Sequence, residues 1–303
     1  MKIAIAGGSG FVGEPLVRRL VSRGDDVVVL SRSPAKVRAG RGVQWDGQSQ
    51  GAWTADVASA DVVVNLAGEN IGDGRWTAER KRRLIDSRLN ATRALVHALD
   101  RAIETEPTRR RAFINASAIG FYGLRGDESL TESASRGTGF LADLVARWEE
   151  EARHAEKAAR LVILRFGVVL AGDGGALAKM LLPFKLGVGG RIGSGQQWMS
   201  WVSRDDLIRM IEWAIGKDSA RGIYNVTSPV PVRNVDFTKA LGHALHRPTI
   251  FPIPGFVLKA AFGEMADEVL LGGQRVIPAR AMEEGFVFSH LPIEPALKHA
   301  LGA

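Results

Sequence analysis

Residues 2–13 read KIAIAGGSGFVG, a short apolar run followed by glycines at positions 7, 10 and 13. The run Lys2–Ala6 predicts a buried β-strand, and apolar residues at helical spacing predict a helix over 11–23. In such a turn the first glycine permits the tight bend, the second lets the backbone approach a pyrophosphate, and the third allows close helix–strand packing. The N-terminus of the helix also offers free N–H groups to phosphate. The stretch therefore predicts a dinucleotide site, and a purely structural βα turn is the alternative.

Short β-branched runs alternate with longer helical patterns through the first two thirds of the chain. Strands are expected at 26–31, 43–45, 61–66, 112–115, 161–166 and 222–226, and helices at 77–103, 139–159 and 204–215. This alternation is typical of an α/β fold with a doubly wound parallel sheet. Prolines punctuate the chain after residue 247, and helices are expected over 256–271 and 293–301. We therefore expect a large domain over 1–230 and a small, mostly helical C-terminal domain over 231–303, packed over the carboxyl edge of the sheet on the substrate side.

The end of the second strand indicates which dinucleotide the turn would bind. An NAD site places an acidic residue there for the ribose 2′-hydroxyl, whereas this chain has Ser31-Arg32-Ser33. Arginine pairs with a 2′-phosphate that a carboxylate would repel, so NADP(H) is expected. The alternative is that Arg32 is merely exposed and the site accepts either cofactor. The small residues that follow the strand at 61–66 would let the adenosine ribose lie close to the backbone. The expected cofactor-binding residues are Gly7, Ser9, Gly10, Phe11, Val12, Gly13, Ser31, Arg32, Leu66, Ala67 and Gly68.

Several longer segments carry a family resemblance across nearly the whole chain. Besides the glycine turn they are 65–71, 73–77, 86–88, 117–123, 164–170, 193–201, 246–248 and 272–278. Together they resemble the short-chain dehydrogenase/reductase superfamily, in its extended, sugar-nucleotide-epimerase-like branch, and most closely an atypical subgroup of epimerase-family proteins. The resemblance implies a Rossmann-like core, NADP binding and a small C-terminal domain, but no settled reaction.

The proton relay of the redox members of that superfamily is absent. They use a Tyr-x-x-x-Lys pair, in which the lysine lowers the pKa of the tyrosine. The chain has two tyrosines, Tyr122 and Tyr224, and the residues four positions later are Gly126 and Ser228. Candidate substitutes are Ser117, as a donor to a substrate carbonyl or a simple strand-end serine, and Tyr122, as a proton donor or a residue that shapes the pocket. Glu69 beside the nucleotide site is interpreted as a base or, alternatively, as a brace for its loop.

The remaining composition excludes several classes of function. There is no cysteine, which excludes disulfides and thiolate chemistry, and no apolar stretch approaches the length of a membrane span. The net charge of +7 is not accompanied by a nucleic-acid-binding motif, so no nucleic-acid partner is expected. The six histidines are scattered, and His243 and His246 lack a third ligand, so no metal site is expected. We therefore expect a cytoplasmic NADP-dependent oxidoreductase or epimerase with an unidentified small-molecule substrate, or alternatively a non-catalytic NADP(H)-responsive binding or regulatory protein.

Overall fold

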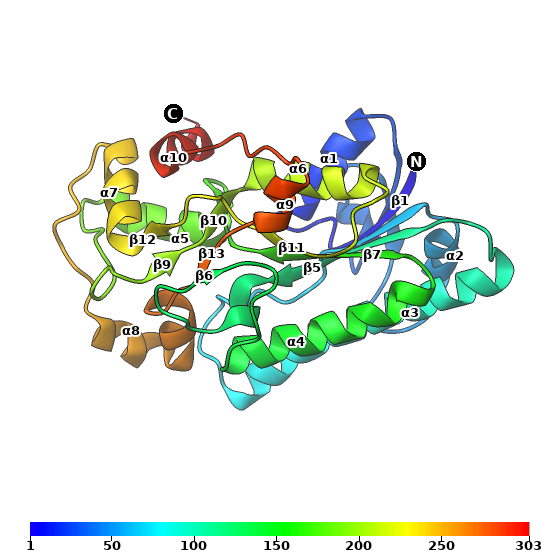
Figure 1. Cartoon of the computed structure of the whole chain (residues 1–303), viewed down its shortest axis with the longest axis horizontal. Coiled ribbons are helices and arrows are strands. Elements are labelled where there is room, and N and C mark those ends of the chain that lie inside the picture. The colour runs from blue at the N-terminus through cyan, green and yellow to red at the C-terminus, as the bar shows by residue number, and fades with distance from the viewer. Residues whose placement is uncertain (303) are drawn as a thin grey trace.

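A computed structural model describes residues 1–302 and is built on a seven-stranded, fully parallel sheet (Figure 1). Its strand order is β11-β7-β5-β4-β1-β2-β3, so the order reverses between β1 and β4. Buried aliphatic residues fill the central strands, as expected for a parallel sheet that is covered on both faces. The strands are β1 (Lys2–Ala6), β2 (Asp26–Ser31), β3 (Arg41–Gln44), β4 (Val62–Asn65), β5 (Ala112–Ala118), β7 (Arg160–Phe166) and β11 (Gly222–Val226).

Helices cover both faces of this sheet, which confirms the doubly wound, Rossmann-like α/β fold. One core packs α1 (Gly13–Ser22), α6 (Arg204–Gly216) and α9 (Ala279–Glu283) on one face. The other face carries α2 (Trp53–Ala58), α3 (Ala78–Thr105) and α4 (Phe140–Arg153), and the two long helices α3 and α4 lie along it in Figure 1. The short turns η1 (Pro34–Lys36), η2 (Ile119–Tyr122) and η3 (His154–Lys157) connect these elements.

A smaller lobe with its own apolar core lies beside the sheet, at the end where α7 and α10 are drawn in Figure 1. Its helices are α5 (Gly175–Lys185), α7 (Asn234–Leu245) and α10 (Ile293–Leu301), and they pack around the buried Trp201. Segments from both sides of residue 230 thus build this lobe, and the domain division at 230/231 stays a prediction. The short strands β8 (Val168–Ala171) and β10 (Trp201–Ser203), β9 (Trp198–Met199) and β12 (Val232–Arg233), and β6 (Ser129–Leu130) and β13 (Arg275–Val276) pair two by two.

Two of the predicted elements differ clearly in the structure. The strand expected at 112–115 continues to Ala118, because residues 116–118 pair with β7, so Ser117 lies within the strand. The helix expected over 256–271 is interrupted at Gly263, whose φ of +60° ends α8 (Gly255–Phe262) before η4 (Ala266–Leu270) begins. Within residues 1–302, no helix is both long and apolar enough to cross a membrane.

Candidate functional site

The glycine turn lies at the carboxyl end of β1, where the strand order of the sheet reverses. In doubly wound folds this crevice is where ligands bind. Gly7 adopts a φ of +78°, and a Cβ on it would lie 2.7 Å from the carbonyl carbon of Leu66. The turn therefore contacts the segment that follows β4. The glycine turn and residues 66–68, both predicted to bind the cofactor, thus lie together at the switch point, where the strand order reverses between β1 and β4.

The start of α1 presents unpaired backbone donors beside this turn. The helix begins at Gly13, where a Cβ would collide with the carbonyl oxygen of Gly7 and lie 2.7 Å from the Cα of Gly8. Among the described residues, the backbone N–H groups of Phe11 and Val12 have no hydrogen-bond acceptor. Free donors at a helix N-terminus favour a bound anion.

The predicted 2′-phosphate residue lies at the end of β2. Ser31 is buried and its hydroxyl accepts a hydrogen bond from the Ser33 N–H at 3.1 Å. Arg32 is exposed, and no carboxylate of residues 1–302 lies within 4 Å of its guanidinium. Its charge is therefore available to a ligand.

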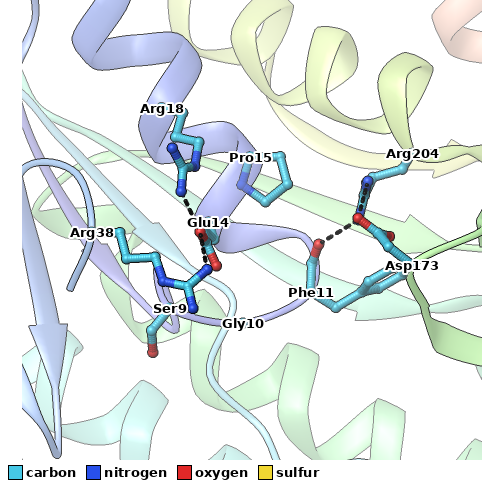
Figure 2. Close-up of a pocket in the computed structure, with 9 residues that line it drawn as sticks. All are labelled: Ser9, Gly10, Phe11, Glu14, Pro15, Arg18, Arg38, Asp173 and Arg204. Carbon is cyan, nitrogen blue, oxygen red and sulfur yellow. Dashed lines mark hydrogen bonds and ion pairs between the residues drawn. The ribbon is translucent and has the colours of Figure 1, made fainter. Parts of the chain in front are cut away.

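A cavity of about 340 Å³ opens along the outer side of the turn (Figure 2). Glu14 projects into it between two arginines, with ion-pair distances of 2.7 Å to Arg18 and 3.5 Å to Arg38. The hydrogen bond from Arg18 lowers the pKa of the Glu14 carboxyl. These basic residues escaped the sequence analysis, because Arg38 follows the second strand by seven positions and no motif marks it. The full lining is Ser9, Gly10, Phe11, Glu14, Pro15, Arg18, Arg38, Asp173 and Arg204.

The far side of this cavity is held by an ion pair that reaches the turn. Arg204 makes two contacts with the carboxylate of Asp173, at 2.6 and 2.9 Å, and lies 5.0 Å from the centre of the Phe11 ring. The same ring packs on Gly174, where a Cβ would come within 2.6 Å of it. Phe11 thus joins the glycine turn to the starts of α5 and α6.

An arginine lies on the β4 side of the crevice. The guanidinium of Arg88 packs against Gly68, where a Cβ would lie 3.2 Å from Cζ, and against the Trp148 ring, whose centre is 5.2 Å away. Its Nη1 donates to the Leu84 carbonyl at 3.0 Å, and no carboxylate of residues 1–302 pairs with it. Burial lowers the pKa of Arg88 to about 10. This side chain offers a desolvated cation to a ligand over β4.

Ser117 belongs to a buried polar network. Its hydroxyl donates to Oε1 of Glu149 at 2.6 Å, and Arg165 donates to both oxygens of the same carboxylate at 2.7 Å. Ser117, Glu149 and Arg165 are all at most 2% exposed. The Ser117 hydroxyl is therefore engaged with protein and turned away from solvent.

Tyr122 extends the same network and is fully buried. Its hydroxyl donates to Oδ1 of Asn225 at 2.7 Å and accepts from Arg165 at 2.9 Å. Burial raises the pKa of the Tyr122 phenol, which is opposite to the activation that a proton donor needs. The catalytic roles of Ser117 and Tyr122 stay predictions, and in this conformation neither hydroxyl reaches a surface open to substrate.

The candidate base Glu69 and three tryptophans from the segments that carry the family resemblance are engaged within the protein. Glu69 forms an ion pair with Arg80, which braces the loop after β4. Trp76 and Trp201 are buried in apolar clusters. Trp198 donates to Asp127 at 2.7 Å.

The buried Glu149–Arg165 pair is the part of this region that the sequence analysis missed. The sequence pattern that could have revealed this pair lies in α4. Val145 and Trp148 mark the inward face of the helix, and Glu149 follows Val145 by four residues, which places it on the same face. A carboxylate on a buried helix face needs a partner, and the strand residue Arg165 could have been sought for that role.

Comparison with known proteins agrees with this geometry. Residues 3–227 match the model of the NAD dependent epimerase/dehydratase family, and residues 253–300 match a domain of unknown function, DUF1731. A Mycobacterium tuberculosis relative, Epimerase family protein MT2273, is 41% identical over 301 residues, covering 98% of this chain and 97% of its own. Bacillus subtilis YfhF, also named an epimerase family protein, is 39% identical over 306 residues, covering 99% and 98%.

Solved structures extend the comparison. Human epimerase family protein SDR39U1, crystallised with NADPH, superposes with a TM-score of 0.89 at 33% identity, covering 100% of this chain and 99% of its own. The UDP-glucose 4-epimerase of Thermus thermophilus, in complex with NAD, shares the fold at 18% identity with a TM-score of 0.77, covering 99% of this chain and 98% of its own. The predicted family resemblance is confirmed: the chain belongs to the NAD dependent epimerase/dehydratase family, among the epimerase-family proteins of the short-chain dehydrogenase/reductase type.

Proposed function

We propose that this chain binds NADP(H) at the β1–β4 switch point and acts as an oxidoreductase or epimerase on a small molecule. One observation carries the cofactor: the acceptor-free N–H groups of Phe11 and Val12 lie at a helix start, and Arg32, which pairs with no carboxylate of residues 1–302, directly follows the neighbouring strand β2. Two anion-binding features on adjacent elements suit the pyrophosphate and the 2′-phosphate of one dinucleotide. The NADPH bound to human SDR39U1 supports the same choice of cofactor.

The residues present fit each part of that cofactor. The pyrophosphate would lie over residues 10–13, the adenosine ribose beside 66–68, and the 2′-phosphate beside Arg32. Ser9 directly precedes the pyrophosphate residues, and Ser31 directly precedes Arg32. When bound, the nicotinamide supplies or accepts a hydride. Because the adenosine half belongs over β1 and β2, the nicotinamide half belongs over β4 and β5.

Beside β4, where the two halves of the cofactor would meet, Arg88 is a cation that no carboxylate of residues 1–302 pairs with. Its planar fork of donors suits a carboxylate or carbonyl oxygen of a substrate, and Gly68 leaves room for it against the backbone. Arg88 would orient the substrate and stabilise negative charge that develops on its oxygen during hydride transfer.

A second candidate function is a nucleotide-responsive binding or regulatory protein. The specific observation in its favour is that the hydroxyls of Ser117 and Tyr122 are both engaged in a buried network, while the Tyr-x-x-x-Lys pair is absent. Incubation with tritium-labelled NADPH and a metabolite extract separates the two functions. Release of tritium from the cofactor supports catalysis, and persistent retention together with tight NADPH binding supports regulation.

The cofactor is tested by titrating NADPH and NADH into the wild-type protein, Arg32→Ala and the matched control Arg82→Ala. Arg82 is an exposed arginine of α3 without an ion-pair partner in residues 1–302. A lost charge-assisted hydrogen bond is worth about 1.5–3 kcal/mol, so Arg32→Ala should weaken NADPH roughly 10- to 100-fold. NADH affinity and the control should stay unchanged. Equal affinity of the wild type for both cofactors would overturn the assignment to NADP(H).

A further inference from the structure

The last helix of the chain is fastened to the start of α6 by two neighbouring carboxylates. Asp206 is 1% exposed and accepts hydrogen bonds from the backbone N–H groups of Ser289 at 2.9 Å and His290 at 3.0 Å. Helix α10, which follows, buries Ala296 and Leu297 in the core of the smaller lobe. The backbone around His290 and the whole of α10 are therefore held in fixed positions relative to α6.

The second carboxylate, Asp205, faces two imidazoles that this arrangement brings together. Its Oδ2 lies 2.6 Å from Nε2 of His299 and 3.8 Å from Nε2 of His290. The two rings are stacked, with centres 4.0 Å apart and planes inclined by 19°. The three ligand atoms all lie within 4.8 Å of one another, although their residues come from α6, the segment before α10, and the last turn of α10.

Two imidazole nitrogens and a carboxylate oxygen are a preferred ligand set for zinc-like cations. Ligand atoms around a tetrahedral zinc ion lie roughly 3.3 Å apart, given metal–ligand bonds near 2.0–2.1 Å. The separations from Asp205 Oδ2 to the two imidazole nitrogens, 2.6 and 3.8 Å, lie on either side of that value. Asp205 and His299 are each about half exposed, at 49% and 50%, which leaves room for a water ligand in the fourth position.

The charges nearby do not oppose a cation. Arg209 pairs with Asp206 at 2.6 Å, Lys298 with Glu294 at 3.1 Å, and Arg204 with Asp173 at 2.6 Å. Each neighbouring cation thus has its own carboxylate, and the charge of Asp205 is left to the two histidines.

We propose that Asp205, His290 and His299 form a binding site for a divalent transition-metal ion of the zinc class, which clasps α10 to α6. None of these three residues belongs to the dinucleotide crevice. Metal binding at this site can also be measured without an assay of enzymatic turnover. The site was not predicted from the sequence, because its ligands are separated by 85 and 9 residues and match no metal-binding spacing.

The test uses the full chain freed of metal with a chelator and titrated with ZnCl₂ or CoCl₂. Calorimetry should show one ion per chain, Co²⁺ should give the visible absorption of a four-coordinate site, and Zn²⁺ should raise the melting temperature. His299→Ala and Asp205→Asn should each weaken binding by more than about tenfold, since even supporting residues around a metal contribute 10- to 100-fold. Their circular dichroism spectra, recorded without metal, report whether they are folded.

His243→Ala is the matched control. His243 lies 3.6 Å from the carboxylate of Glu294, so it is a single imidazole beside one carboxylate on the same lobe. The control should bind Zn²⁺ like the wild type. Equal Zn²⁺ binding by the wild type and a folded His290→Ala/His299→Ala double variant would overturn the proposal, as would the absence of any saturable binding by the wild type.

Discussion

Replacing Glu149 with glutamine tests what the buried network of Ser117, Tyr122 and Arg165 does. The carboxylate accepts three hydrogen bonds, two from Arg165 and one from Ser117, and both charged side chains are almost fully buried. Glutamine keeps the shape but removes the counter-charge, which leaves a guanidinium in the interior that is paired only with neutral groups.

The cost follows from that burial. Breaking a buried ion pair by removing one partner destabilises a protein by about 3–5 kcal/mol. This is a large share of the roughly 5–15 kcal/mol that separates a typical folded protein from its unfolded chain. Ser117→Ala removes one hydrogen bond to a charged group and should cost about 1.5–3 kcal/mol.

Urea unfolding followed by tryptophan fluorescence measures both free energies of unfolding. In the folded variants, NADPH affinity should change little, because neither side chain reaches the crevice. A Glu149→Gln protein within about 0.5 kcal/mol of the wild type, the range of an ordinary surface substitution, would show that the buried ion pair does not stabilise the fold as expected. A stable Ser117→Ala protein that has lost tritium exchange from NADPH would contradict a structural role and would identify Ser117 as catalytic.

Three further predictions concern the tyrosines, the turn and the crevice. Burial raises the pKa of both Tyr122 and Tyr224, so the stability that comes from their neutral form is complete below pH 10 and is lost as the pH rises through the folded-state pKa values. At pH 10 the native chain should therefore show less phenolate absorbance than the urea-unfolded chain, and a tyrosine half-ionised below pH 10 would contradict this. Gly13→Ala should abolish NADPH binding measured by fluorescence titration, because its Cβ meets the Gly7 carbonyl; unchanged affinity in this variant would show that the turn does not hold the pyrophosphate. Arg88→Gln should leave NADPH affinity within a few-fold but slow tritium exchange, and unchanged exchange would remove Arg88 from the proposed mechanism.

The fold was predictable because local patterns specify it. Strand β11 and helix α10 coincide with the predicted ranges, and the glycine turn lies between β1 and α1 as expected. Each of these elements follows from apolar periodicity or glycine geometry within a dozen residues.

The candidate site was less predictable because its partners are distant in sequence. That Ser117 would face a carboxylate depends on α4 packing against β5 with Glu149 inward, a contact across 32 residues. The cavity beside the turn depends on Arg204, nearly 200 residues from Phe11. The turn and the end of β2 share one βαβ unit, so their proximity could be inferred, whereas these tertiary contacts could not.

A crystal structure of this chain with NADPH would locate the three parts of the bound cofactor at once. We expect the pyrophosphate on the N–H groups of Phe11 and Val12, the 2′-phosphate within hydrogen-bond distance of Arg32, and the nicotinamide over β4 and β5. A 2′-phosphate that points into solvent away from Arg32, or a dinucleotide that does not contact the glycine turn, would contradict this placement.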